Sequence, residues 1–399
     1  MRGVTVVRLR PAPALAPRPE TRAALEAIRR WGEERDWLGY DPYDALRSPL
    51  APTLTLGTRA GRRALTQLVK RCPLNLRPLL RIRPDWNSKA IALVASGYAR
   101  LAAARSDPEL EAHAACWLAT LLLRGERGDG LAWGYNFDVQ TRFFRYARET
   151  PNAIATTFAV GALLEGRRRL GAEQWLEAAE RACEGLLSSL LVEDGGRRFF
   201  AYLPGERRLV HNANALAAAA AVGTGRAAGR PDLVQRGLDA LETTIAGQRE
   251  DGSWPYSEPP GGRWVDNVHT AYVLQSLARC AAVEPSLERP LARGLDFWAE
   301  ALFAGDRPRY AVDATYPLDA HCYADAIETW VAVAPWRPEA PAAAQRAAAA
   351  LVRDMLSPRG SVYLQRRRLW TNRVPCVRWS TAPAFRALAG LELLAGREP

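Results

Sequence analysis

Residues 238–278 show how hydrophobic and polar positions alternate along this chain. Apolar residues in 238–248 recur at the spacing of one helical face, and Gly252 then ends that pattern where positive φ is favoured. An aromatic stretch and a loop follow. Asp266 stands where a helix N-cap is expected, and a second apolar helical run covers 267–278. This segment therefore predicts a helix, a glycine turn, a short extended piece and a second helix.

The same arrangement recurs along the chain from Trp86 onward. Each turn is preceded by an apolar helical segment, followed by aromatic residues, and then by another helix. The turns lie 53 to 65 residues apart, at Gly130, Gly195, Gly252, Gly305 and Gly360. Two helices per unit, without long alternating strands, indicate stacked helical hairpins. We predict an all-α fold in which five or six hairpins close into a ring, an (α/α)5–6 toroid.

The segments before the repeats carry a different pattern. Residues 1–20 contain no long apolar run, so we expect neither a secretion signal nor a membrane anchor there. We expect a flexible arm over 1–20 and a single toroid domain over 21–399, with a first helix beginning near Thr21. Residues 59–83 carry eight basic side chains on a mixed apolar background. A solvated helix face and an anion-binding strip both account for that stretch.

Composition narrows the classes of protein that need to be considered. The chain has 399 residues, 48% hydrophobic and 24% charged, which is typical of an ordinary globular protein with a large core. Its net charge of +11 favours an anionic partner, but the basic residues form no tight block, so nucleic-acid binding is not expected. The six cysteines are far apart and form no CxxC pair. Reduced thiols in a cytoplasmic protein, without a structural zinc site or cofactor, are expected.

The repeat register locates a candidate site. His211, His269, His321 and Arg378 follow their glycine turns by 16 to 18 residues, and Asn152 opens the corresponding helix of the first repeat. In a ring of hairpins these residues lie at one end of the inner helices, around the mouth of a central cavity. Helix N-termini at such a mouth favour an anion. The alternative is that the Asn and Asp residues are helix caps and the histidines pack in the core.

An inserted segment, 132–152, is predicted to belong to the same mouth. Trp133 and Tyr135 supply flat apolar faces, while Asn136, Asp138 and Arg142 supply donors and acceptors among them. That mixture suits a sugar ring, whose C–H face stacks on aromatic side chains. An aromatic loop that only plugs the ring accounts for it equally well.

The stretch from Gln248 through Gly252 to Trp254 resembles the Q-x(2–5)-G-x-W repeat of squalene cyclases and protein prenyltransferase β subunits. Weaker copies occur at the other glycine turns, and the resemblance covers about residues 86–395. The segments WGYNFDVQTRFF, VHNANAL, DGSWPY and CVRWS are also similar to bacterial and archaeal proteins labelled as prenyltransferase or squalene-oxidase repeat proteins. That group has no settled activity, and many members are associated with surface-polysaccharide production. The resemblance implies the toroid and points to polysaccharide chemistry.

The motifs of terpene chemistry are incomplete in this sequence. Class II terpene cyclases protonate an alkene with a D-x-D-D cluster, and no such run exists here. Prenyltransferase β subunits hold zinc through widely separated ligands, whereas Asp319, His321 and Cys322 stand close together. A terpenoid cyclase or prenyltransferase-like enzyme of non-standard motif therefore remains an alternative, as does a non-catalytic glycan-binding toroid.

We expect a carbohydrate-active enzyme that binds an acidic oligo- or polysaccharide and acts by proton transfer, as a lyase, an epimerase or a hydrolase. No metal and no stable membrane insertion are expected. The candidate catalytic residues are His269, His211, Asp266, Asp138, Tyr256 and His321. The candidate substrate-binding residues are Trp133, Tyr135, Asn136, Arg142, Asn152, Asn212, Asn214, Trp254, Asn267, Asp319, Arg378 and Trp379.

Overall fold

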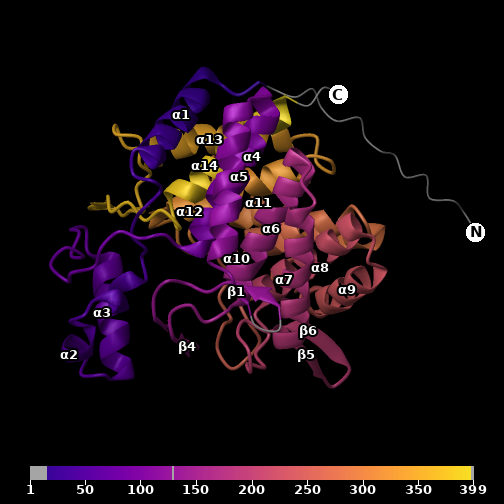
Figure 1. Ribbon diagram of the computed structural model, residues 1–399, viewed down its shortest axis with the longest axis horizontal. Coiled ribbons are helices and arrows are strands. Elements are labelled where there is room, and N and C mark those ends of the chain that lie inside the picture. Colours follow the sequence, from indigo (N-terminus) through magenta and orange to yellow (C-terminus); the bar gives the residue numbers. More distant parts are fainter. Residues whose placement is uncertain (1–15, 128–129, 397–399) are drawn as a thin grey trace, which may run out of the picture.

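Six helices that are apolar on almost every side form the inner ring of the protein. A computed structural model describes residues 16–127 and 130–396. Neighbouring inner helices contact each other all the way round, and the last packs against the first (Figure 1). In ring order they are α4 (Ser88–Arg105), α6 (Ala153–Leu170), α8 (His211–Ala228), α10 (Asn267–Ala281), α12 (Ala320–Val333) and α14 (Thr381–Ala395). Burial on all sides explains why these segments lack a polar face.

A second layer of amphipathic helices covers the ring. Each inner helix pairs with an antiparallel outer helix, and the outer partner of α14 is the N-terminal helix, so the two ends of the chain close the ring. The outer helices are α1 (Pro19–Glu33), α5 (Pro108–Leu123), α7 (Gln174–Leu190), α9 (Pro231–Ala246), α11 (Glu288–Ala301) and α13 (Ala340–Met355). Six hairpins confirm the predicted all-α toroid, at the upper of the two expected numbers.

Short antiparallel strands occupy the connections from outer to inner helices. They pair as β1 (Glu126–Arg127) with β2 (Leu131–Ala132), β3 (Val139–Gln140) with β4 (Arg145–Tyr146), β5 (Leu191–Asp194) with β6 (Arg197–Phe200), and β7 (Phe303–Ala304) with β8 (Arg307–Pro308). A three-stranded sheet has the order β11 (Thr371–Asn372), β10 (Gln365–Arg366) and β9 (Leu318–Asp319). A 3-10 turn, η2 (Pro285–Leu287), precedes α11. These are the extended pieces expected after the glycine turns.

The glycine turns serve two purposes. Gly195, Gly252, Gly305 and Gly360 have positive φ, as expected for residues that end a helix or a strand pair. Gly130 is absent from this group, and a Cβ there would lie 2.7 Å from the Cα of Gly185 in α7. Its small size is therefore required by close packing and not by its φ.

Two residues of the motif at Gly252 hold the glycine turn against the helices beside it. Gln248 donates to the carbonyl of Gly252 in its own turn and to the carbonyl of Pro290 in α11, both at 3.0 Å. Trp254 donates from Nε1 to the carbonyl of Thr244 in α9, at 2.9 Å. The Q-x(2–5)-G-x-W spacing thus has a local structural reason in this chain.

The loops also hold the start of each inner helix. The first backbone N–H of an inner helix donates to a carbonyl of the following connection, in four successive repeats. The pairs are Ala153 with Tyr202, His211 with Tyr256, Asn267 with Tyr310, and Ala320 with Leu364, at 3.0 to 3.2 Å. Three of the four acceptors are tyrosines that follow a glycine turn. This repeated contact places a ring of tyrosines at the N-terminal end of the inner helices.

A small lobe stands apart from the ring, at the lower left of Figure 1. It contains η1 (Asp44–Arg47), α2 (Ala51–Thr55) and α3 (Arg59–Arg71). Arg77 is buried within the lobe and donates to the Asp44 carboxylate at 2.8 Å. This arginine of the basic stretch therefore belongs to a structural ion pair. We name residues 44–84 the lobe.

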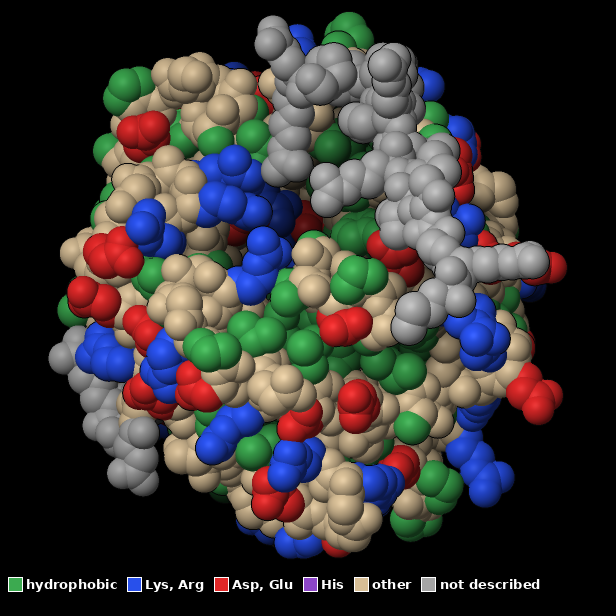
Figure 2. Space-filling model, turned by 90° about the vertical axis from the view of Figure 1, so that its right-hand side faces the viewer, with side chains coloured by type: hydrophobic (Ala, Val, Ile, Leu, Met, Phe, Trp, Pro, Cys, Tyr) green, Lys and Arg blue, Asp and Glu red, His purple; other side chains and the backbone are tan. Residues whose placement is uncertain are grey.

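The surface opposite the lobe shows mixed charge. Figure 2 shows that side, where acidic and basic side chains are interspersed and one basic cluster lies beside a recess. Among the residues described, no helix combines the length and apolar character needed to span a bilayer. The predicted arm over 1–20 falls mostly outside the described residues, and α1 begins at Pro19, two positions before the expected start.

Candidate active site

The residues that share a repeat register lie at one end of the ring. Asn152 caps α6, His211 opens α8, His269 and His321 lie in the first turns of α10 and α12, and Arg378 precedes α14. The inner helices run parallel because each is followed by an antiparallel outer helix, so these positions share one rim. We call this rim the mouth of the ring.

His269 and Asp266 form a hydrogen-bonded pair at the mouth. Asp266 caps α10 by accepting the His269 backbone N–H at 3.0 Å, and its other oxygen lies 2.6 Å from Nδ1 of the same histidine. Trp264 also donates to that oxygen at 3.0 Å. Because an ionised carboxylate can only accept, Nδ1 carries the proton and Nε2 carries the lone pair. In the described part of the chain no hydrogen bond engages Nε2, and the side chain is 34% exposed.

The electrostatics of this pair favour an ionised aspartate. Burial alone raises the pKa of the Asp266 carboxyl, but His269, by charge and by hydrogen bonding, brings the pKa below its ordinary value. Asp266 therefore stays charged at neutral pH and can stabilise a proton on His269. The geometry is that of a general base oriented by a carboxylate.

A wall of stacked aromatic rings adjoins His269. The Tyr256 ring lies 4.6 Å from the imidazole and is stacked on Trp264 at 4.7 Å. Phe143, from the predicted aromatic insertion, continues the stack at 5.9 Å from Trp264. Trp264 is 38% exposed, so an apolar face is open to solvent beside the imidazole of His269. Such a face suits the C–H side of a pyranose.

Two arginines add positive charge to this wall. The Arg208 guanidinium lies 4.7 Å from the centre of the Phe143 ring, and that of Arg142 lies 5.8 Å from the centre of the Trp264 ring. Arg208 also donates to the backbone carbonyl of Pro260 at 3.0 Å. Neither arginine has a carboxylate partner among the described residues, so the wall has uncompensated positive charge.

Below the rim, three helices contribute to a buried chain of hydrogen bonds. Lys89 of α4 donates from Nζ to the Tyr272 hydroxyl of α10 at 2.8 Å, and that hydroxyl lies 2.6 Å from Nε2 of His321 in α12. Nδ1 of His321 lies 2.7 Å from the carbonyl of Trp379. A carbonyl can only accept, so Nδ1 is protonated, Nε2 is the acceptor, and Tyr272 donates to it. The proton positions along the chain are thereby determined.

The pKa values in this chain move toward neutral forms. Burial lowers the pKa of the Lys89 amine well below its ordinary value, and Arg378 nearby lowers it further. Burial and the charge of Lys89 lower the pKa of His321. Burial also raises the pKa of Asp325, whose Oδ2 lies 3.7 Å from Nε2 of His321. His269 and Tyr272 lie three residues apart on α10, and Tyr272 contacts His321, so the exposed pair and the buried chain are adjacent.

Several predicted substrate-binding residues have structural partners. Trp133 donates to the carbonyl of Leu121, and Asn152 accepts the N–H of Ala155 as an N-cap. Asn214 and Asn267 form hydrogen bonds through both the oxygen and the nitrogen of their side-chain amides. Asn214 contacts Phe200, Ala240 and Thr244, and Asn267 contacts Leu302 and Trp298. Together with Trp254, described above, these side chains connect helices and loops. Their contacts favour the alternative of caps and packing residues.

Arg378 has a partner that is distant in sequence. It makes a two-pronged ion pair with Asp41, including an Nη2 to Oδ1 distance of 2.9 Å, and its guanidinium lies 4.8 Å from the centre of the Tyr135 ring. Asn136 donates to Asp85 at 2.9 Å, and Asp138 accepts the N–H of Arg148. These contacts join the aromatic insertion to the lobe side of the mouth and leave Arg378 neutralised.

Asp319 and His321 both contact Trp379 but otherwise have separate partners. The Asp319 carboxylate accepts from Gln365 at 2.6 Å and from Nε1 of Trp379 at 2.9 Å, while the His321 ring contacts the Tyr272 hydroxyl and the Trp379 carbonyl. The polar atoms of both side chains are therefore engaged by protein groups. Within the described ranges, no three His, Cys, Asp or Glu side chains are grouped as metal ligands.

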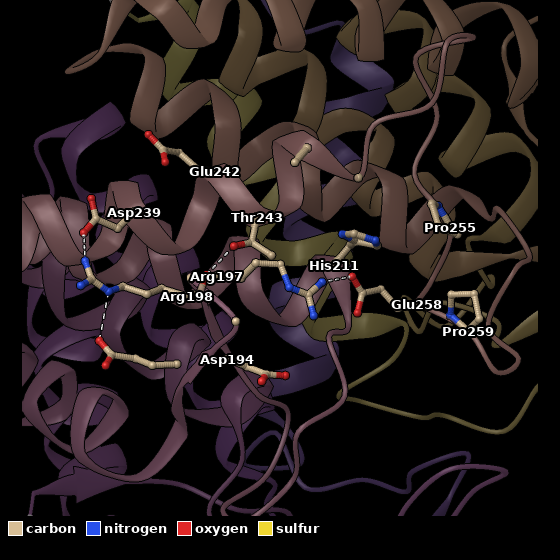
Figure 3. Close-up of a pocket in the computed structure, with 15 residues that line it drawn as sticks. Asp194, Arg197, Arg198, His211, Asp239, Glu242, Thr243, Pro255, Glu258 and Pro259 are labelled. Carbon is tan, nitrogen blue, oxygen red and sulfur yellow. Dashed lines mark hydrogen bonds and ion pairs between the residues drawn. The ribbon is translucent and has the colours of Figure 1, made fainter.

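His211 opens α8 at the same rim, but its side chain lines a lateral groove on the side of α9. This groove has a volume of about 990 Å³ and runs between the β5–β6 hairpin, α9 and the 255–259 loop (Figure 3). His211 is 2% exposed, and its ring abuts Gly247, where an added Cβ would come within 2.4 Å. Neighbouring Asn212 is also buried, with an Oδ1 that has no partner among the described residues. The position of His211 is that of a packing residue beside the Arg197–Glu258 ion pair.

Four residues at or below the mouth are not among the site residues predicted from the sequence: Lys89, Tyr272, Trp264 and Asp41. Lys89 and Tyr272 occupy the interior face of helices whose every face is apolar or small, so helical periodicity does not distinguish them. Asp41 lies in a turn, 337 residues from Arg378. A sequence signal existed only for Trp264, an aromatic residue two positions before a predicted N-cap.

Comparison with known proteins identifies the fold. No family model and no curated protein sequence matches this chain. The solved structures of similar fold include an unsaturated glucuronyl hydrolase specific for heparin, with a TM-score of 0.63, 12% identity and coverage of 94% of this chain and 96% of that one. The cellobiose 2-epimerase of Bacillus thermoamylovorans has a TM-score of 0.60 at 11% identity, covering 77% and 87%. A polysaccharide lyase has a TM-score of 0.54 at 10% identity, covering 76% and 89%.

These likenesses show that the chain has the α/α-toroid architecture found in carbohydrate-active enzymes. At 10 to 12% identity they carry the fold alone. The predicted resemblance to squalene cyclase repeats is supported only at this coarser level, as a toroid of helical hairpins.

Proposed function

We propose that this protein is a carbohydrate-active enzyme that binds an acidic oligo- or polysaccharide at the mouth of the ring and acts on it by proton transfer. The observation that carries the proposal is the pairing of His269 with Asp266 at 2.6 Å beside the exposed aromatic wall. It combines a base with a platform for a sugar ring. The comparisons support a saccharide substrate, since the three similar structures described above are named as sugar-active enzymes.

In this proposal His269 removes a proton from the sugar. Its Nε2 lone pair accepts the proton, and Asp266 stabilises the imidazolium that forms. A carbon-bound proton is acidic enough only when the adjacent carboxylate or carbonyl of the sugar is neutralised. We assign that role to Arg142 and Arg208, whose charges are uncompensated at the wall. Arg378, Asn214 and Asn267 are less suited to it, because their polar groups already have protein partners.

The buried chain supplies the second proton site. Tyr272 is held between Lys89 and His321, and burial with the charge of Asp325 raises its pKa well above the ordinary value. The Tyr272 hydroxyl can give its proton to the carbanion of the product, the hydrogen bond from Lys89 stabilises the phenolate that forms, and solvent then returns a proton to it. A base and an acid three residues apart on α10, one exposed at the rim and one buried below it, match the needs of a lyase or an epimerase.

A hydrolase fits the mouth less well. Retaining and inverting glycosidases need two available carboxyl groups across the scissile bond. Asp138, Asp266 and Asp319 each accept hydrogen bonds from the protein. We therefore favour proton abstraction over hydrolysis within this proposal.

We also propose that residues 21–399 act as one domain in the cytoplasm, which agrees with the six unpaired thiols.

The proposal is tested by incubating the protein in heavy water with a panel of uronate-containing oligosaccharides and reducing disaccharides. A lyase is expected to give an unsaturated uronate, seen by ultraviolet absorbance, and an epimerase to give a new epimer with deuterium at the exchanged carbon, seen by NMR. Hydrolysis without exchange would contradict the proton-abstraction step. Binding of a panel member without turnover would support a glycan-binding toroid instead.

A further inference from the structure

The lobe carries an unusual combination of charge and exposed apolar surface. Between Asp44 and Asp85 the chain has nine basic residues and no acidic one. Five leucines of this stretch are 55 to 83% exposed: Leu54, Leu56, Leu68, Leu74 and Leu79. Burial of apolar side chains is strongly favoured, so five exposed leucines in so short a stretch mark an interaction surface.

The helix α3 arranges these two properties on one element. Leu65 and Val69 are buried against the rest of the lobe, whereas Ala60, Ala64 and Leu68 are exposed at helical spacing on another face. Exposed arginines adjoin that face at positions 63 and 71. An apolar stripe bordered by arginines is the pattern of a helix that lies in a membrane interface.

The basic side chains of the lobe are also uncompensated. Two ion pairs, Arg77 with Asp44 inside the lobe and Arg47 with Asp85 directly after it, account for two of the positive charges. The exposed arginines, at positions 59, 63, 71, 81 and 83, have no carboxylate partner in the described ranges. Several exposed arginines on the ring, among them Arg197, Arg198 and Arg230, are ion-paired. With five unpaired exposed arginines and no acidic residue between Asp44 and Asp85, the lobe is suited to an external anion.

A second segment extends the same surface. The tip of the β10–β11 hairpin presents Leu369, 89% exposed, and Trp370, 41% exposed, beside the run Arg366–Arg368. Asn372 of this hairpin donates to the carbonyls of Lys70 and Cys72 at the end of α3, at 3.1 and 3.2 Å. Tryptophan and leucine at a loop tip with neighbouring arginines are typical of an interfacial anchor.

We propose that the lobe and the β10–β11 tip together dock the protein reversibly on an anionic lipid membrane. The leucines and Trp370 enter the boundary between headgroups and acyl chains, and the arginines contact lipid phosphates and acidic headgroups. The charge selects an anionic surface, and the exposed apolar side chains, which are spread over α2, α3 and the loops on either side, suit a lipid layer better than one protein partner. No spanning helix is required.

The surface proposed to dock on the membrane lies close to the mouth of the ring. Arg59 of the lobe donates to the carbonyl of Arg142 at 2.8 Å, and Lys70 lies 5.7 Å from the centre of the Trp379 ring, which stacks on His321. The docked surface is therefore adjacent to the active site. This step rests on the proposed function: docking places the mouth next to the membrane, where it can act on a saccharide that the membrane carries.

The test uses the full chain and sedimentation with vesicles, and it needs no turnover. We expect the protein to sediment with phosphatidylcholine vesicles that contain about one third phosphatidylglycerol, and at least tenfold less with phosphatidylcholine alone. Binding is expected to fall as salt is raised from about 0.1 to 0.5 M, because screening weakens the arginine contacts. Equal binding to both vesicle types, or none, would overturn the proposal.

Variants separate this surface from general stickiness. Leu369→Ser with Trp370→Ser, and Leu54→Ser with Leu56→Ser, are each expected to lower vesicle binding at least fivefold without changing the melting temperature, since the side chains are exposed. Leu123→Ser is the matched control, because Leu123 is 81% exposed on α5, outside the lobe. Arg63→Gln with Arg71→Gln is expected to abolish the preference for anionic vesicles. Membrane docking would be refuted if these variants lost no more vesicle binding than Leu123→Ser. It would also be refuted if the protein bound a single-stranded oligonucleotide but not the vesicles.

Discussion

At the scale of single residues, the proposed chemistry depends on which nitrogen and oxygen atoms hold protons. His269 and His321 are both placed by an acceptor at Nδ1, a carboxylate in one case and a backbone carbonyl in the other. The first leaves a lone pair toward the open mouth, and the second leaves a lone pair that accepts from Tyr272. Similar imidazoles thus have different roles because one is exposed and the other is buried.

His269 is the residue whose substitution separates catalysis from packing. His269→Gln is expected to change the free energy of unfolding by less than about 1 kcal/mol, because the side chain is partly exposed. Turnover is expected to fall by roughly 100-fold or more, the usual contribution of a general base. Asp266→Asn is the matched variant, since asparagine also caps a helix but does not stabilise an imidazolium. Thermal melts beside turnover assays check both; a destabilised variant with full activity per folded molecule would refute the assignment.

His211 gives a prediction about stability and pH. Burial, with a smaller effect of Arg249, lowers the pKa of His211 to about 4 from its ordinary 6.5. Below pH 6.5 the unfolded chain takes up a proton that the folded chain resists, so this contribution to stability is complete above pH 6.5 and is lost as the pH falls toward 4. The full loss corresponds to about 3 kcal/mol.

Urea unfolding at pH 7 and pH 4.5 measures this contribution. In His211→Leu the difference in unfolding free energy between the two pH values should be smaller than in the wild type by a large part of that amount. An unchanged difference would show that other groups account for the acid sensitivity. A His211→Leu variant with normal turnover would also fit its place in the lateral groove.

At the scale of elements, the glycine turns show what a sequence pattern can establish. The turn at Gly252 was predicted from a broken helical period, and its φ of +89° confirms the expected conformation. The pattern did not show that an added Cβ there would lie 2.4 Å from the carbonyl oxygen of Arg293 in α11. That second requirement comes from packing between repeats, which a local period does not contain.

Gly252→Ala is therefore expected to be more harmful than a positive φ alone would imply. We expect a loss of 2 kcal/mol or more, from backbone strain together with the clash against α11. Gly195→Ala is the control, because its φ is +55° and no other atom lies within 4 Å of an added Cβ. The control should lose about 1 kcal/mol. Equal urea midpoints for the two variants would contradict the packing argument.

Candidate site residues were harder to predict than elements. An asparagine at a helix entrance has the same sequence signature whether it caps, ties two helices or binds a ligand. Asn267 ties α10 to α11 through both ends of its amide, and only the structure reveals these partners. The repeat register did locate the mouth, since it depends on where inner helices begin and not on what each side chain contacts.

At the scale of the whole molecule, the toroid follows from the spacing of turns, but its closure and its centre do not. The outer partner of α14 is α1, which carries no trace of the repeat. Lys89 is 183 residues from Tyr272, and Asp41 is farther still from Arg378. Contacts of such separation arise only once the ring is closed, so no local pattern predicts them. The lobe is likewise outside the repeat, and its basic stretch left two interpretations open.

Binding and reaction of a saccharide at the mouth of the ring can be tested by a crystal structure of the His269→Gln variant with an acidic oligosaccharide. We expect a sugar ring stacked on Trp264 or Phe143, with its carboxylate near Arg142 or Arg208 and one ring carbon within reach of position 269. An oligosaccharide bound instead in the lateral groove beside His211, with the mouth unchanged, would contradict this expectation.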